Sequence, residues 1–249
     1  MKNLKKNVVL ALCILGIVSC EKAETDTEIQ NIEKQENFMS TTGNSDTTVA
    51  DDQSKVIQPM FHMHFGPEVS EEEGHAKFDK AIAKYFNNNS KLDVDGTGTT
   101  FLNYIVQTRT GTYEDSGSHH CGTDGSVRIH IDFRTDLGYI HQNNIVLNNP
   151  GNDREGGWDV YYLRLKPTKN GNLVNWIEIP SAGISLKGKD GWYLRTVNVF
   201  LGSYINSSSN FAALHSRPEM WLDNNTNNGW DFFYTNSSDT TVETGRYNL

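Results

Sequence analysis

From Thr100 onward, apolar and polar residues alternate in short runs, and this alternation is what most constrains the fold. Clusters of Gly, Asn, Asp and Pro separate the runs, as turns separate strands. Seven or eight strands over about 135 residues, joined by turns at this spacing, favour an antiparallel β-sandwich. The predicted strands are Phe101–Thr108, Val127–Arg134, Ile140–Leu147, Val160–Leu165, Leu173–Ile179, Trp192–Leu201 and Trp230–Tyr234.

One amphipathic helix is predicted before the strands, over residues 70–87. Ser70 and Glu73 have the spacing of a capping box, and acidic residues follow in the first turn, where the helix dipole favours them. Apolar residues then recur at helical spacing on one face, and the opposite face is charged. That apolar face consists of Phe78, Ile82, Tyr85 and Phe86.

Two histidine-containing segments allow either a soft metal site or a plain structural role. In the first, His62 and His64 alternate with methionines, which suits a metal cluster or a half-buried extended segment. The second is His119-His120-Cys121, which suits a metal site or a polar loop with one free thiol. In both cases we favour the structural interpretation.

The first twenty residues have the pattern of a secretion leader. Three lysines precede an apolar stretch, Val8–Val18, which is too short for a transmembrane helix and fits a signal-peptide core. The leader ends in Ile-Val-Ser-Cys at residues 17–20, which resembles the lipobox of bacterial lipoproteins. The resemblance implies cleavage before Cys20, lipidation of its thiol and an outer-membrane location. An ordinary secretory leader is the alternative.

An acidic segment follows the leader. Residues 21–52 hold nine acidic residues and two lysines with few large apolar residues, which predicts a solvated tether. Acidic residues in this position resemble a surface-export signal of Bacteroidetes lipoproteins, and a periplasm-facing position remains the alternative. The predicted organisation is a signal peptide (1–19), a disordered acidic tether (20–57), a short helical segment (58–96) and a β-sandwich (97–249).

Composition and motifs exclude several classes of function. The formal charge of −9 argues against nucleic-acid binding. Cys13 leaves with the signal peptide and Cys20 carries lipid, so Cys121 has no partner for an intramolecular disulfide. The sequence contains no nucleophile elbow, zinc-protease motif, phosphate-binding loop or dinucleotide-binding motif. We therefore expect a non-enzymatic protein.

Three loops offer oxygen ligands directly before predicted strands. Calcium takes six to eight oxygen ligands, and loops at one end of a sandwich can converge on one ion. The alternative is that these segments are only favourable turns, because they are rich in Asn, Asp and Gly. The loops are Cys121–Gly125, Asn148–Asp159 and Lys187–Gly191.

Four motifs in order resemble the PLAT domain family. They span roughly Thr100 to Tyr234, and the second loop looks most like the calcium-binding C-terminal domain of clostridial alpha-toxin phospholipases. The resemblance implies an eight-stranded, C2-like sandwich with calcium bound in loops at one end. The motifs are Gly122-Thr123-Asp124, Gly156–Asp159, Trp192-Tyr193-Leu194 and Met220–Asp223.

The same resemblance implies a calcium ligand set. The chain departs from the pattern at His120 and Asn148, where the family has acidic residues, which predicts weaker binding or fewer sites. Glu114 or Asp115 in the longer preceding loop is a candidate replacement. The implied ligands are Gly122, Thr123 and Asp124, then Asn149, Gly151, Asn152 and Asp153, and finally Asp190 and Gly191.

The sequence predicts a monomeric surface lipoprotein whose calcium-binding domain contacts membrane lipid or a partner protein. The alternative is a carbohydrate-binding or structural module that has lost the ion. Trp158 and Trp230 lie next to loops, which makes them candidates for exposed membrane contacts. Trp192 and Trp221 match core positions of the resembled family.

Overall fold

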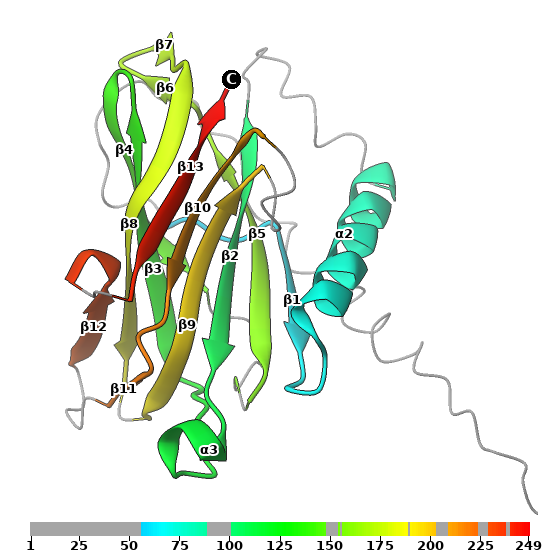
Figure 1. The fold of residues 1–249 in the computed structure, drawn as a ribbon, viewed down its shortest axis with the longest axis vertical. Coiled ribbons are helices and arrows are strands. Elements are labelled where there is room, and N and C mark those ends of the chain that lie inside the picture. Colours follow the sequence, from blue (N-terminus) through cyan, green and yellow to red (C-terminus); the bar gives the residue numbers. More distant parts are fainter. Residues whose placement is uncertain are drawn as a thin grey trace, which may run out of the picture. The chain divides into compact units, whose positions relative to one another are not determined.

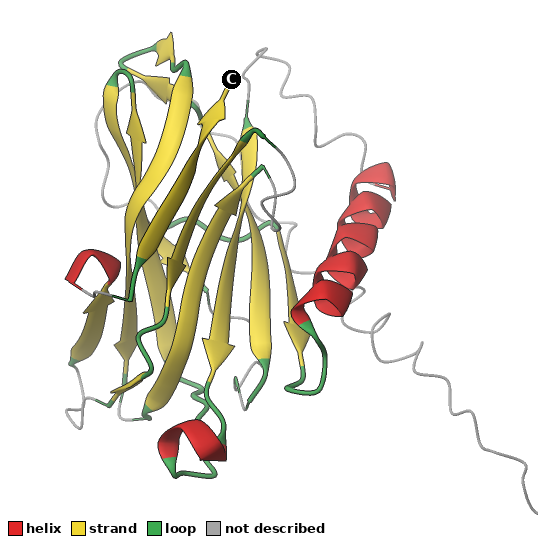
Figure 2. Cartoon of the chain, viewed as in Figure 1, coloured by secondary structure: helices red, strands yellow, loops and turns green. Residues whose placement is uncertain are grey.

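Antiparallel strands dominate the fold and confirm the β-sandwich that the alternation predicts (Figures 1 and 2). The computed structural model describes residues 56–88, 101–147, 154, 156–188, 190–202, 209–223, 229–237 and 240–249. The signal peptide, Cys20 and nearly all of the predicted tether lie outside the described residues. Within the described ranges, the helices are too short or too polar to cross a bilayer.

The first layer of the sandwich has the strand order β1–β5–β2–β9–β10, and β11 pairs with β9. Its alternating residues face the second layer on one side and a helix or solvent on the other. Its strands are β1 (Phe61–Phe65), β2 (Leu102–Thr110), β5 (Trp158–Leu165), β9 (Trp192–Leu201), β10 (Phe211–Ser216) and β11 (Met220–Leu222).

The second layer has the order β8–β3–β4, and β12 pairs with β8 on its other side. A two-stranded hairpin of β6 and β7 precedes β8, and a short 3₁₀ helix, η2, follows β12. The elements are β3 (Ser126–Thr135), β4 (Gly138–Val146), β6 (Thr168–Lys169), β7 (Asn172–Leu173), β8 (Trp176–Lys187), β12 (Trp230–Tyr234) and η2 (Thr235–Ser237).

Strand β13 (Val242–Asn248) joins the two layers. Its first part pairs with β10, and Tyr247 and Asn248 pair with β8. The apolar core lies between the layers and takes one side of each strand. On β3, for example, Val127, Ile129 and Ile131 are buried, and the residues between them face outward.

Helix α2 (Glu71–Asn88) covers the outer face of the first layer beside β1 (Figure 1). The predicted N-terminal cap is present, because the Glu73 amide donates to the Ser70 hydroxyl at 3.2 Å. Phe78 is fully buried and packs against Phe61, with ring centroids 5.5 Å apart. The apolar face predicted for this helix is therefore confirmed.

Trp158 is fully buried under α2, so the prediction that it is an exposed membrane contact is wrong. Its indole N–H donates to the Val69 carbonyl at 3.2 Å, and its ring packs 4.6 Å from the Phe65 ring. A Cβ atom on Gly74 would lie 2.3 Å from the Trp158 ring, so the helix approaches closely here. Trp158 is the first residue of β5 and not part of the second loop. In the strand, its side chain lies under the helix.

Several strands extend or add to the predicted set, so the described residues contain thirteen strands rather than eight. The segment predicted as a separate helical piece, residues 58–96, contributes β1 to the sandwich, where β1 pairs with β5. Strand β8 is much longer than the predicted Leu173–Ile179. Strands β10 and β13 were not predicted. All described residues lie in one compact unit, Thr48–Leu249.

Candidate functional site

The first and third candidate calcium loops meet at one end of the sandwich. The Asp124 amide donates to the Asp190 carboxylate at 2.9 Å, and the Thr123 hydroxyl donates to the Asp190 carbonyl at 3.3 Å. Strand pairing places the loops together, because Ser126 at the start of β3 pairs with Lys187 at the end of β8. The structure therefore confirms that these two loops converge, and both aspartates are exposed.

The ligands predicted on the second loop, which are Asn149, Gly151, Asn152 and Asp153, lie outside the described residues. The base of the loop is described. The Leu147 amide donates to the Val127 carbonyl at 3.0 Å, and the Arg154 guanidinium donates to the Leu147 carbonyl. Arg154 is 1% exposed, with its guanidinium over the Trp192 ring at 5.7 Å. The loop thus leaves and re-enters the fold beside the start of β3, where the first loop ends.

Asp223 is a further acidic residue at this end that the sequence did not single out as a ligand. A Cβ atom on Gly191 would lie 3.4 Å from the Cβ and Cγ atoms of Asp223, so the side chain borders the third loop. Within the described ranges, no three His, Cys, Asp or Glu side chains are close enough to hold a metal ion. A calcium ion here would therefore need further oxygen ligands, and the second loop is their predicted source.

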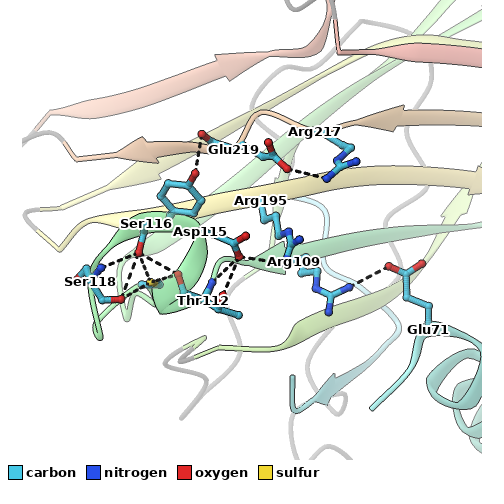
Figure 3. Close-up of polar contacts among 11 residues, drawn as sticks. Glu71, Arg109, Thr112, Asp115, Ser116, Ser118, Arg195, Arg217 and Glu219 are labelled. Atoms are coloured by element: carbon cyan, nitrogen blue, oxygen red, sulfur yellow. Dashed lines mark hydrogen bonds and ion pairs between the residues drawn. The ribbon is translucent and has the colours of Figure 1, made fainter. Parts of the chain in front are cut away.

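The longer loop before Cys121 holds its polar groups in internal contacts (Figure 3). Helix α3 (Tyr113–Ser116) lies in it, and the Asp115 carboxylate accepts from the Thr112 amide at 2.8 Å and pairs with Arg195 at 3.1 Å. Asp115 is thus bonded within the loop and to Arg195 of β9, whereas Glu114 is exposed. The Cys121 thiol is buried 2.9 Å from the Ser116 hydroxyl and is free among the described residues.

A buried carboxylate is held by the two histidines of β1. His62 Nε2 lies 2.7 Å and His64 Nδ1 3.2 Å from the same Asp159 oxygen, and Asp159 is 1% exposed. Strand pairing sets this contact, because β1 and β5 place His64 opposite Asp159 and His62 opposite Tyr161. The extended structure predicted for the two histidines is confirmed, whereas their buried partner was not predicted.

The protonation of this cluster follows from its burial. Desolvation alone would raise the pKa of the Asp159 carboxyl, but hydrogen bonds and charge from His62 and His64 bring it well below its ordinary value. Burial lowers the pKa of His62, although the contact with Asp159 opposes this effect. The imidazoles therefore act as hydrogen-bond donors to a buried anion, which is a structural arrangement.

Comparisons with known proteins identify no family for this chain. A scan against protein-family models finds no match, and neither does a search of curated proteins. Among solved structures, the chain is similar to alpha-toxin from an avian strain, SWCP, of Clostridium perfringens, with a TM-score of 0.33 and 20% sequence identity. The alignment covers 56% of this chain and 33% of the toxin chain, so the chain spans about a third of the toxin's length.

Trp230, the second predicted membrane contact, is half-buried at the start of β12. It pairs across the sheet with Lys187, which places it at the end of the sandwich where the first and third candidate loops converge. The Arg128 guanidinium lies 4.9 Å and the Lys187 amine 5.7 Å from its ring centroid. Trp192 is fully buried and Trp221 is partly buried.

Proposed function

We propose that this chain is a non-enzymatic, monomeric lipoprotein of the bacterial outer membrane whose PLAT-like sandwich binds calcium and contacts anionic lipid. A partner protein is the alternative target of the same loops. The contact between Asp124 and Asp190, which lie 66 residues apart in the sequence, carries the proposal. It holds two exposed carboxylate-bearing loops at one end of a rigid fold, as a loop-bound calcium ion requires.

Charge explains why the ion matters for the contact. Asp124, Asp190 and Asp223 place three carboxylates at this end, in a chain of formal charge −9, so these carboxylates and an anionic membrane repel each other when no cation is bound. When bound, calcium supplies local positive charge and coordination positions for phosphate oxygens. The aspartates would hold the ion, and Trp230 would lie beside them at the level of the headgroups, which indole favours.

Calcium is expected to stabilise the protein, and Asp190→Asn to remove most of this effect. A ligand that binds only the folded state adds about 2.7 kcal/mol at a concentration of 100 Kd. For a domain of this size that raises Tm by about 5–11 °C. The asparagine retains an oxygen that can accept from the Asp124 amide, so the calcium-free Tm stays near the wild-type value. Thermal melts with calcium and with chelator measure both effects.

Asp136→Asn is the matched control. Asp136 lies in the turn between β3 and β4, at the other end of β3, and accepts from the Asn175 amide at 2.9 Å. This variant should keep the full calcium shift. An unchanged wild-type Tm in millimolar calcium, or equal loss of the shift in both variants, contradicts a site at Asp190.

Cys20→Ala is expected to release the protein from the membrane. The leader pattern before Cys20 implies that its thiol carries the lipid. In a bacterial host, the wild-type protein should partition into detergent, and the variant should remain in the aqueous phase. Equal partitioning of the two proteins excludes the lipid anchor.

The anchor-free variant also distinguishes lipid from protein as the target. The full chain with Cys20→Ala is sedimented with phosphatidylserine vesicles in calcium and in chelator. We expect the protein to pellet only in calcium, and Asp190→Asn to abolish pelleting. A calcium shift in Tm without any pelleting favours the partner protein.

A further inference from the structure

Three aromatic side chains form a row on the outer face of the second layer. Trp230, Phe232 and Tyr234 alternate along β12, while Phe233 between them points into the core. The exposed fractions of Phe232 and Tyr234 are 53% and 43%. Successive ring centroids are 6.4 and 6.1 Å apart, and the ring planes differ by 29° and 9°. The fold thus presents evenly spaced, nearly parallel rings to solvent.

Strand β8 lies between β12 and β3 (Figure 1), and its small outward residues separate the aromatic row from basic residues of β3. Phe232 is opposite Ser185, which is opposite Arg128. On the next outward rung, Gly183 lies between Tyr234 and His130. A Cβ atom on Gly183 would lie 1.9 Å from the His130 ring, so the imidazole packs directly on the glycine. The centroids of the His130 and Tyr234 rings are 5.4 Å apart.

Two cations of this face lack a counterion in the part of the chain that the structure describes. Arg128 and Lys187 both contact the Trp230 ring, but neither has an ion pair there with a carboxylate. The Nε atom of Arg128 is buried without a hydrogen-bond partner. Asp132, on the same side of β3, is occupied by His141 at 2.6 Å and by Ser181 at 2.7 Å. An incoming anion would supply the carboxylate partner that Arg128 and Lys187 lack among the described residues.

We infer that this face binds an acidic polysaccharide. The rings of Phe232 and Tyr234 offer apolar surfaces on which the C–H faces of successive sugar units pack, and Arg128 and Lys187 pair with the carboxylate of a uronate unit. Charge complementarity supports this occupant, because Arg128 and Lys187 lie beside the aromatic row and have no carboxylate partner among the described residues.

The shape of the row favours a linear chain over a flat membrane. The aromatic residues follow one strand for about 13 Å, since alternate residues of a strand advance by roughly 6.6 Å. A linear glycan that lies along β12 contacts each ring in turn. A membrane surface meets the loop end, where Trp230 lies, and leaves Tyr234 at the far end of the row.

Affinity electrophoresis of the full chain through gels that contain polygalacturonate tests the inference. Chelator is present throughout, which makes the result independent of the proposed calcium function. Polygalacturonate should retard the wild-type protein, and the neutral glycan dextran should not. Arg128→Gln and Phe232→Ala should each weaken the interaction by about tenfold, and added salt should weaken it further.

Two matched variants control for charge and aromatic content. Arg217→Gln removes an exposed arginine that pairs with Glu219, and Tyr139→Ala removes an exposed aromatic of β4. Both should be retarded like the wild type, and melts of all variants verify that they fold. Equal retardation of Arg128→Gln and Arg217→Gln, retardation by dextran, or no retardation overturns the inference. If the protein sediments with anionic vesicles in chelator but is not retarded by polygalacturonate, the face binds a membrane instead.

Discussion

Replacing Trp158 by Ala is expected to lower the free energy of unfolding by about 3–5 kcal/mol, the usual cost of truncating a buried large aromatic side chain. The indole fills the space between α2 and the first layer and bonds to the Val69 carbonyl. Its removal leaves a cavity and an unpaired carbonyl. For a domain of this size, Tm should fall by about 6–20 °C, which a thermal melt measures.

Trp230→Ala is the comparison for this substitution. Its ring is half-buried on the outer face of the second layer, so its loss should cost well under half as much. If Trp158 were a surface contact, the two variants would unfold at similar temperatures and Trp158→Ala would show the larger loss of membrane binding. Nearly equal melting temperatures would therefore contradict the buried position of Trp158.

Asp159→Ala is expected to cost about 3–5 kcal/mol, because the substitution removes one member of a buried charged cluster. The N–H groups of His62 and His64 lose the acceptor that both contact. Asp132→Ala is the matched control, since Asp132 also bonds to a histidine, His141, at 2.6 Å, but both side chains are partly exposed. That variant should lose no more than about 1 kcal/mol. Equal losses would contradict the role of burial.

His62 of this cluster and two histidines elsewhere in the fold, His130 on β3 and His215 on β10, predict how stability depends on pH. Burial lowers the pKa of His62, His130 and His215 in the folded protein, so the unfolded chain binds protons more readily below about pH 6.5. The free energy of unfolding should fall as pH decreases from 7 to 5. The pKa of Asp159 is lowered too, and its contribution is lost only below about pH 4. Denaturant titrations should show a flatter profile for His62→Gln between pH 7 and 5.

Local alternation was sufficient to predict strands that have one buried face. The prediction of Trp192–Leu201 matches β9 at both ends, and Trp230–Tyr234 matches β12. Strand β13 was not predicted, because it is largely exposed and joins the layers through its backbone. Trp158 is buried by a helix about eighty residues earlier in the chain. The pattern of residues around Trp158 carries no information about that helix.

Part of the candidate site could likewise be predicted from the sequence, and part could not. The position of each loop directly before a predicted strand indicated that loops at one end of the sandwich can converge, and the contact between Asp124 and Asp190 confirms this for the first and third loops. Asp223 lies beside Gly191 because β11 pairs with β9. Strand β11 has only three residues, which is too short for an alternation pattern to be recognised in the sequence. The buried partner of His62 and His64 likewise requires the register of β1 on β5.

The segment that leads into β1 determines how the fold bears a mechanical load. Ile57 exchanges backbone hydrogen bonds with Asn144 and Val146 around β4, at the far end of the strand order, and the Met60 amide bonds to the Tyr162 carbonyl of β5. A pull along the chain from the N-terminal side therefore reaches both layers within four residues. The force is shared between the two sheets from the start, so tension on a tether would not simply peel β1 from an edge.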